Sequence, residues 1–221
     1  NQCVNSHPPT TYGQIETAAL SQLQNIINAA GQTAFKKAVK LVIVGNEILW
    51  QDEKKTNAAK IVGSINKVKT LLDNSNLSSI PLTVSLQADV WVQSNLPGRK
   101  SIAAALPAGS PIAINVYPFQ WMATVTESMD PSYVHSVPYY VTSIKTQYGR
   151  PVIISETGWA SKGKYVDGNN HATGSVKDAA AFYPKVYSYA TQNSIPTLVF
   201  MAYDTPTKSL SNSNMSSEDF Y

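Results

Sequence analysis

The chain has 221 residues, 43% of them hydrophobic and 14% charged, and its 17 Lys and Arg against 14 Asp and Glu give a net charge of +3 at pH 7. This length suits one large domain or two small ones and can bury a sizeable core, and the composition excludes global disorder. We expect a single domain over residues 1–221. No apolar run approaches the roughly 20 residues that span a bilayer, and the mild, dispersed positive charge lacks the basic stripe of a nucleic-acid-binding protein.

Short apolar runs alternate with amphipathic segments along the chain. In chain order, the predicted elements are a helix over 14–30, a strand over 39–45, a helix over 55–73, strands over 82–86 and 111–116, a helical segment over 132–147, a strand over 151–155, a helix over 177–191 and a strand over 196–202. This alternation predicts an α/β fold with a parallel sheet and helical crossovers. A doubly wound sheet and a (β/α)8 barrel both satisfy the pattern, which does not distinguish them.

Polar and aromatic side chains follow the predicted strands. Sites in parallel α/β folds form at the carboxyl ends of the strands, so these residues are the candidates for function. They are Asn46 and Glu47 after the first strand, Asp89 and Trp91 after the second, Asn115 and Tyr117 at the third, Glu156 and Trp159 after the fourth, and Tyr203 and Asp204 after the fifth.

Glu47 and Glu156 each follow an apolar strand. A carboxylate in that position is costly unless it is paired, hydrogen-bonded or used in chemistry. Two carboxylates about 5–5.5 Å apart perform retaining glycoside hydrolysis, one as nucleophile and the other as acid/base. We therefore predict that these two glutamates are catalytic. The alternative is that either one forms half of a structural ion pair.

A sugar substrate accounts for the other residues at the strand ends. Sugar rings present C–H faces that pack on aromatic side chains, and their hydroxyls bond to amides and carboxylates. The predicted substrate-binding residues are the aromatics Trp91, Tyr117, Trp159 and Tyr203 and the polar Asn46, Asn115 and Asp204. Two of these have plain alternatives: Trp91 could belong to the core, and Asp204 could cap a helix that begins after Pro206.

No metal or organic cofactor is predicted. Cys3 is the only cysteine, so neither an intrachain disulfide nor a cysteine zinc cluster can form. The three histidines, His7, His135 and His171, lack metal-ligand spacing. Walker, G-x-G-x-x-G, G-x-S-x-G and H-E-x-x-H motifs are all missing from the sequence.

Three strand-end segments resemble motifs of glycoside hydrolase family 17: VIVGNEIL over 42–49, INVYPF over 114–119 and VIISETGWAS over 152–161. The resemblance covers residues 14–204 and is closer to the fungal cell-wall members. It implies a (β/α)8 barrel that acts on β-1,3-glucan as a glucanase or a glucanosyltransferase, without a cofactor.

The same resemblance implies a role for each matching residue. Glu47 would be the acid/base and Glu156 the nucleophile, and Asn46 would hydrogen-bond the sugar 2-hydroxyl. Asn115 and Tyr117 match positions that line the cleft. In addition, Trp159 matches an aromatic residue beside the nucleophile.

The chain also departs from the family. Its five predicted strands correspond to strands four to eight, and the first three strands have no counterpart. We therefore expect a barrel that is incomplete at both ends and not independently stable, since an open arc leaves unpaired strand edges. Two alternatives stay open: a glucan-binding cell-wall protein without turnover, and a doubly wound domain with an unrelated small ligand.

The expected partner is a β-1,3-glucan oligosaccharide or polysaccharide, and the protein is expected to be a monomer. Two Asn-x-Ser sequons, at Asn76 and Asn214, agree with a secreted, extracellular or cell-wall location. The two glutamates do not distinguish hydrolysis from glycosyl transfer. Phe119 and Trp121, after the third strand, are candidates for holding an acceptor sugar.

Overall fold

A computed structural model describes residues 11–47, 57–92, 98–121, 124–167 and 170–200. Five strands form one sheet in the order β1-β2-β3-β4-β7, and every neighbouring pair is parallel. The strands are β1 (Val42–Asn46), β2 (Leu82–Gln87), β3 (Ile112–Val116), β4 (Val152–Thr157) and β7 (Thr197–Val199). A separate antiparallel hairpin joins β5 (Lys164–Asp167) to β6 (Asn170–Thr173).

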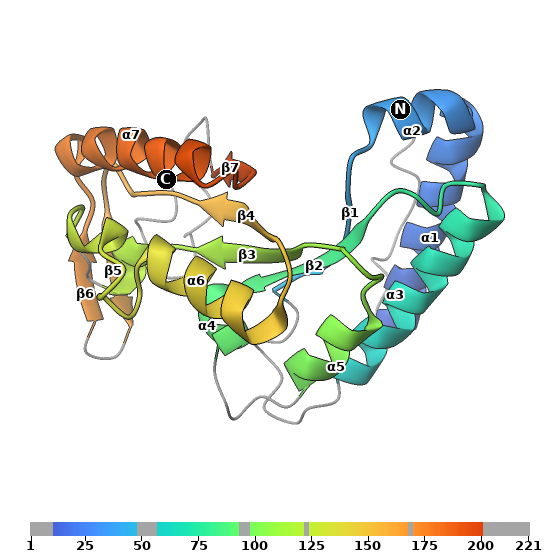
Figure 1. The fold of residues 1–221 in the computed structure, drawn as a ribbon, viewed down its shortest axis with the longest axis horizontal. Helices are drawn as coiled ribbons and strands as arrows, with labels where there is room; N and C mark the ends of the chain where they lie inside the picture. The colour runs from blue at the N-terminus through green and yellow to red at the C-terminus, as the bar shows by residue number, and fades with distance from the viewer. Residues whose placement is uncertain (1–10, 48–56, 93–97, 122–123, 168–169, 201–221) are drawn as a thin grey trace.

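Helices connect the strands. They are α1 (Tyr12–Ala30), α2 (Gln32–Ala38), α3 (Asn57–Asn74), α4 (Ala88–Val92), α5 (Gly98–Ala105), α6 (Val137–Tyr148) and α7 (Val176–Gln192), with short 3-10 helices η1 (Pro118–Trp121) and η2 (Glu127–Met129). The sheet bends into an open arc, and the crossover helices lie on its outer side (Figure 1). None of the helices in the described ranges is long and apolar enough to cross a membrane.

The strand order distinguishes the two architectures that the sequence leaves open. The five strands follow one another across the sheet in chain order, with no reversal. A doubly wound sheet reverses its strand order at a switch point, whereas a (β/α)8 barrel winds in one direction. The chain therefore has the singly wound topology of a barrel. In the described residues β1 and β7 are the two edges of the arc, as expected for a barrel without its first three strands.

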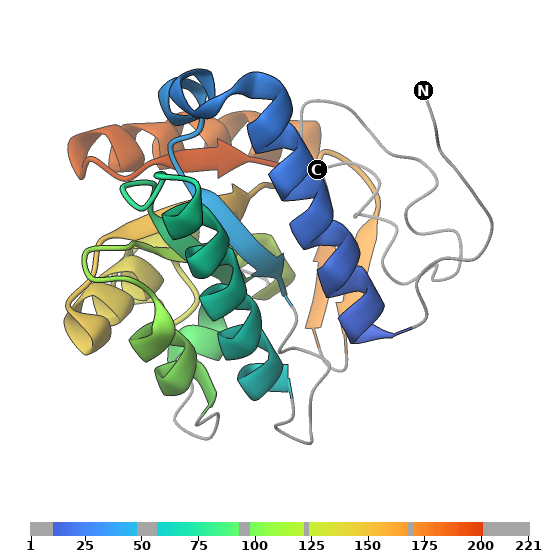
Figure 2. The ribbon, with the colours of Figure 1, turned by 90° about the vertical axis from the view of Figure 1, so that its right-hand side faces the viewer.

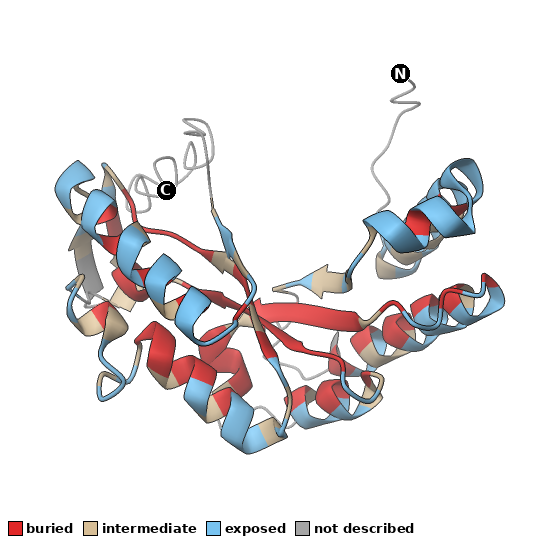
Figure 3. Ribbon diagram, turned by 45° about the horizontal axis from the view of Figure 1, so that its top comes forward, coloured by how far each residue is buried: buried red, intermediate tan, exposed pale blue. Residues whose placement is uncertain are grey.

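The sheet has two chemically different faces. Apolar positions of β2 and β3 pack against α3, α5 and α6; the principal contributors are Ile61, Ile65, Val84, Leu86, Ile102, Ile112, Ile114 and Ile144. Side chains alternate along a strand, so the intervening residues Thr83, Ser85 and Asn115 face the inside of the arc. Both faces of β2 and β3 are nevertheless buried (Figure 3). A polar layer thus lies inside the arc, beside the strand ends.

Local signals explain the helix boundaries. Thr11 forms a capping box with Gln14 at the start of α1, and Gly31, with φ +76°, separates α1 from α2. Helix α6 begins at residue 137 and not at 132, because Ser136 caps its first turn. The left-handed Gly149 ends the helix as predicted. The sequence did not predict α2, α4, α5 or the β5–β6 hairpin.

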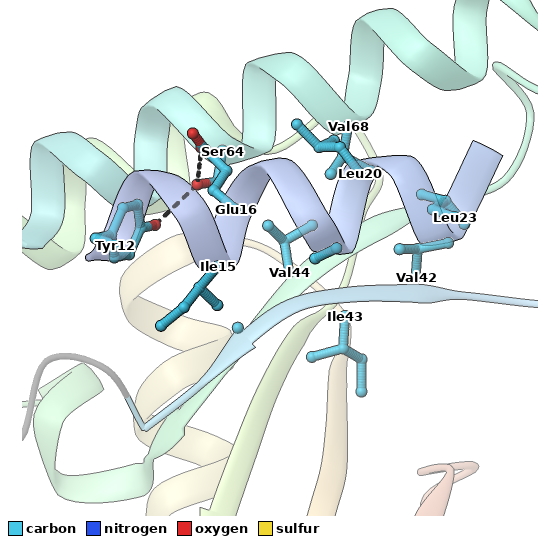
Figure 4. Close-up of a pocket in the computed structure, with 12 residues that line it drawn as sticks. Tyr12, Ile15, Glu16, Leu20, Leu23, Val42, Ile43, Val44, Ser64 and Val68 are labelled. Atoms are coloured by element: carbon cyan, nitrogen blue, oxygen red, sulfur yellow. Dashed lines mark hydrogen bonds between the residues drawn. The ribbon is translucent and has the colours of Figure 1, made fainter. Parts of the chain in front are cut away.

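A groove of about 320 Å³ lies between α1, β1 and α3, which are neighbours in space (Figures 2 and 4). Its lining is mainly apolar. At one end Ser64 donates to Glu16, Tyr12 hydrogen-bonds Ser64, and Lys67 forms an ion pair with Glu16. No predicted site residue lines this groove, so the proposed chemistry belongs elsewhere.

Candidate active site

Strand β1 is irregular at its end, where two consecutive side chains turn toward the inside of the arc. The pairing of β1 with β2 shifts between Ile43 and Asn46, and Gly45 and Glu47 have φ values of +85° and +53°. Glu47 still donates its backbone N–H to Ser85 O at 2.9 Å, so the ladder resumes after the irregularity. In a regular strand Asn46 and Glu47 would point to opposite faces. Here both contact the same side-chain amide, that of Asn115.

The end of β4 carries a second irregularity of the same kind. Ile114 pairs with Ile154 and Asn115 pairs with Glu156, so Ser155 is the extra residue on β4. As on β1, two consecutive residues reach the inner side: Ser155 donates to Asn115 Oδ1, and Glu156 accepts from Asn46. Bulges commonly redirect side chains next to active sites. Each glutamate therefore follows a bulge that places it with its neighbour on one face.

Two amides connect the glutamates. Asn115 Nδ2 donates to Glu47 Oε1 at 2.8 Å and to Asn46 Oδ1 at 3.0 Å. Asn46 Nδ2 in turn donates to Glu156 Oε1 at 3.2 Å. The other oxygen of this carboxylate, Oε2, accepts from the Tyr117 hydroxyl at 2.9 Å. Five of the nine residues predicted to be catalytic or substrate-binding thus form one hydrogen-bonded group.

Burial differs across this group. Asn115 is 2% exposed, whereas Glu47 and Glu156 are half-buried and Asn46 is exposed. Each carboxylate therefore opens to solvent on one side. Glu47 is held by the buried amide of Asn115, and Glu156 by the amide of Asn46 and the hydroxyl of Tyr117. Two carboxyl groups fixed in this way can exchange a proton with, or attack, a polar substrate at the strand ends.

Trp91 was predicted to bind substrate, and that prediction is wrong. The side chain is fully buried, its Nε1 donates to Ala113 O at 3.1 Å, and its ring meets Tyr148 edge-on with centroids 5.5 Å apart. The reason is local: β2 passes directly into α4, whose buried first turn directs Trp91 into the core. The alternative, that Trp91 is a core residue, is correct.

Trp159 follows β4, three residues after Glu156, but is only 4% exposed. Its ring packs against Phe119 and Phe182, with centroid distances of 5.5 and 5.1 Å. Within the described residues, Trp159 Nε1 is buried without a hydrogen-bond partner, and so is Gln87 Oε1 at the end of β2. Both of these polar atoms lie at or just after the carboxyl ends of the strands, as the glutamates do. Tyr203 and Asp204, the other predicted binding residues, lie outside the described residues.

The structure adds residues that sequence reasoning missed. Ser85 and Ser155 are buried beneath Asn115, and the alternation of small polar with apolar residues in β2 is the signal that could have indicated them. Trp121, which the sequence already offers as a candidate for holding an acceptor sugar, stacks in parallel on His135, with ring centroids 4.0 Å apart. Burial lowers the pKa of His135 and raises the pKa of Asp89, because desolvation disfavours the charged form of each group.

Among the described residues no group of three or more His, Cys, Asp or Glu could hold a metal ion.

Solved glycosidase structures share this fold. An endo-laminarinase from Formosa Hel1_33_131 superposes with a TM-score of 0.70 at 19% identity, over 100% of this chain and 61% of that one. The family 17 β-1,3-glucanosyltransferase of Rhizomucor miehei gives 0.65 at 20% identity, over 92% and 66%. An active-site mutant of the Rhizomucor miehei enzyme, in complex with laminaritriose, gives 0.63 at 20% identity, over 86% and 64%.

At these identities the likeness shows the fold alone, and the chain spans about three fifths to two thirds of each of these structures. No curated protein sequence is significantly similar to the chain. The sequence model of the BtgE/BtgC glycoside hydrolase domain matches residues 11–221, which is nearly the whole chain. The chain therefore belongs to the BtgE/BtgC glycoside hydrolase domain family.

Proposed function

We propose that this protein is a retaining, family 17-type enzyme that acts on β-1,3-glucan, with Glu156 as nucleophile and Glu47 as acid/base. The observation that carries the proposal is the pair of amides, Asn115 and Asn46, that joins the two glutamates at the strand ends. Three solved structures of similar fold are described as an endo-laminarinase or a β-1,3-glucanosyltransferase, which supports the choice of substrate.

The two glutamates differ in their surroundings. Glu156 accepts hydrogen bonds at both oxygens, from Asn46 and from Tyr117. Acceptance at both oxygens suits a nucleophile, whose carboxylate must be ionised when it attacks. Glu47 lies at the end of the edge strand β1, half-buried and open to solvent on one side. That position suits an acid/base, which must reach first the leaving oxygen and then an incoming acceptor.

The reaction has two steps. In the first, a Glu156 oxygen forms a bond to the anomeric carbon while the bond to the glycosidic oxygen breaks, and Glu47 donates its proton to that oxygen. In the second, Glu47 removes a proton from the acceptor, whose oxygen attacks the anomeric carbon and releases Glu156. Water as acceptor gives hydrolysis, and a sugar hydroxyl gives a longer glucan. Asn46 is placed to hydrogen-bond the sugar 2-hydroxyl, where such bonds strengthen in the transition state.

We favour glycosyl transfer over hydrolysis. Trp121 follows β3 on the site side of the sheet and is half-buried, and its ring is held flat against His135. A fixed indole of this kind can hold an acceptor sugar against its face in place of water. Phe119, the other candidate for this role, is 2% exposed and packs on Trp159. Its burial makes it a packing residue.

An extracellular or cell-wall location is part of the proposal. The sequon residue Asn76 is exposed in a turn after α3, with φ +56°, and is accessible for glycosylation. The second sequon, at Asn214, lies outside the described residues.

The test is incubation with a β-1,3-linked gluco-oligosaccharide of defined length, with the products sized over time. Early products longer than the substrate are expected from a transferase, and only shorter ones from a hydrolase. Glu156→Gln should lower kcat by several orders of magnitude, whereas Glu127→Gln, at a half-buried position on η2 whose carboxylate accepts from Thr124 N–H, should leave it unchanged. Saturable binding without any product would instead support the glucan-binding alternative and contradict the proposed enzyme.

A further inference from the structure

Two serine hydroxyls meet beneath the amide that links the glutamates. Ser85 Oγ and Ser155 Oγ lie 2.7 and 2.8 Å from Asn115 Oδ1 and 2.7 Å from each other. All three residues are buried, with 2%, 7% and 2% of their surfaces exposed for Ser85, Ser155 and Asn115. The two serines come from β2 and β4, on either side of β3. The proposed reaction gives them no direct contact with substrate.

The two serine hydroxyls face the oxygen of the Asn115 amide. A side-chain amide has two acceptor sites on oxygen and two donor hydrogens on nitrogen. Here Oδ1 faces the two hydroxyls, and Nδ2 donates to Glu47 and Asn46, so both ends of the amide are engaged. The two serines have two hydroxyl protons for three contacts: one from each serine to Asn115 Oδ1, and one between the serines, where either can be the donor. In either arrangement at least one proton points at Oδ1.

The opposite orientation of the amide would break this group. If Asn115 were rotated by half a turn, its oxygen would face Glu47 Oε1 and Asn46 Oδ1, placing acceptor against acceptor. A hydroxyl can donate or accept, but the amide must present its nitrogen to a carboxylate. If the nitrogen faced the serines, one hydroxyl could donate to the other, but the second hydroxyl proton would lose its acceptor. The serines therefore favour the orientation in which Nδ2 faces Glu47.

We propose that Ser85 and Ser155 are positioning residues for acid catalysis: they hold Asn115 so that its Nδ2 fixes the carboxyl group of Glu47. This inference rests on the proposed function of the two glutamates. It also gives the bulge in β4 a chemical purpose, since Ser155 is the extra residue that the bulge turns inward. Without the bulge, Ser155 and Glu156 would lie on opposite faces of the sheet.

The test compares two substrates that differ in their need for acid catalysis. A β-1,3-gluco-oligosaccharide needs a proton on its leaving oxygen, whereas dinitrophenyl β-laminaribioside releases a stable phenolate without one. In the variant that combines Ser85→Ala with Ser155→Ala, kcat/KM on the oligosaccharide should fall by about tenfold or more. On the aryl substrate it should stay within about threefold. The variant that combines Ser85→Thr with Ser155→Thr, which keeps both hydroxyls, should retain activity on both substrates.

Thr83→Val is the matched control. Thr83 lies on the same face of β2, and its buried hydroxyl donates to Pro111 O at 2.7 Å, away from the amide group. Its loss should lower the melting temperature and leave the ratio of the two kcat/KM values unchanged. If the double serine variant does not fold, each single alanine variant carries the same comparison.

The outcomes separate the inference from the function on which it rests. Wild-type protein that cleaves neither substrate overturns both. An active wild type whose serine variants lose activity equally on the two substrates, or on neither, overturns the positioning role alone. A selective loss on the oligosaccharide supports it.

Discussion

The side-chain amide of Asn46 donates to Glu156 Oε1 at 3.2 Å, although the two residues are 110 positions apart. They lie at the ends of β1 and β4, with β2 and β3 between them in the sheet. Across a flat sheet, strands three places apart would be separated by roughly 14 Å, too far for these side chains to meet. The hydrogen bond therefore depends on the curvature of the arc. The barrel geometry brings the catalytic candidates together.

The irregular end of β1 should tolerate no side chain at Gly45. Its φ of +85° is disfavoured for residues with a Cβ, so Gly45→Ala forces the backbone before Glu47 to change. We expect kcat to fall by tenfold or more, on the order of the loss caused by a misplaced catalytic group, with a fold that persists. The measurement is steady-state kinetics together with a thermal melt.

Gly63→Ala is the control for that change. Gly63 is inside α3, and a Cβ there meets nothing within 4 Å. Alanine in a helix is favoured over glycine by up to about 1 kcal/mol, so this variant should melt at the same or a higher temperature and keep full activity. Equal activity in the two variants would contradict the role given to the bulge.

Tyr117 should contribute to the rate through its bond to the nucleophile. Its hydroxyl donates to Glu156 Oε2 at 2.9 Å, and hydrogen bonds to charged groups contribute about 1.5–3 kcal/mol. Tyr117→Phe removes that donor and is expected to lower kcat by about ten- to a hundredfold, with little change in KM. Tyr187→Phe, at a 73% exposed position on α7, should have no effect. A kcat within twofold of wild type for Tyr117→Phe would show that the hydroxyl does not act on the reaction.

Glu16 should make stability depend on pH. Hydrogen bonds from Lys67 and Ser64 hold the pKa of this carboxyl below its usual value. A depressed pKa in the folded state stabilises the fold above the unfolded pKa of about 4.3, and the contribution disappears as pH falls through the folded pKa. Glu16→Gln should therefore lower the free energy of unfolding at pH 7, by at most about 1 kcal/mol, and not at strongly acidic pH.

Denaturant melts across that pH range measure the difference. Asp73→Asn is the control, because the Asp73 carboxylate forms an exposed i,i+4 pair with Lys69 on α3. Its effect should be small at every pH. A Glu16→Gln difference that is the same at acidic and neutral pH would contradict the link to ionisation.

The sequence predicted the five sheet strands because long buried runs of β-branched residues are a strong signal. It also placed Asn46, Glu47, Asn115, Tyr117 and Glu156 together at the carboxyl ends of the strands, since parallel strands end on the same side of the sheet. The structure joins all five in one hydrogen-bonded group. The roles of these residues in catalysis stay predictions.

Tertiary contacts account for the features that the sequence did not reveal. The bulges before the two glutamates depend on register with neighbouring strands, and only Gly45 marks one of them locally. A tryptophan after a strand can pack in the core or line a cleft, so the position of Trp91 in the sequence did not reveal its burial. Helix α4 is five residues long, too short for a periodic signal.

The assignment of Glu156 as nucleophile and Glu47 as acid/base is tested most directly by azide rescue. An aryl β-laminaribioside with an activated leaving group is incubated with Glu156→Ala or Glu47→Ala in the presence of azide, and the anomeric configuration of the glycosyl azide is determined by NMR. Azide replaces a missing nucleophile in one displacement and inverts the anomeric carbon, whereas with the nucleophile present it attacks the covalent intermediate and gives net retention. We predict the α-azide from Glu156→Ala and the β-azide from Glu47→Ala. The reverse pattern would exchange the two roles, and the absence of any azide product from both variants would contradict the two-glutamate mechanism.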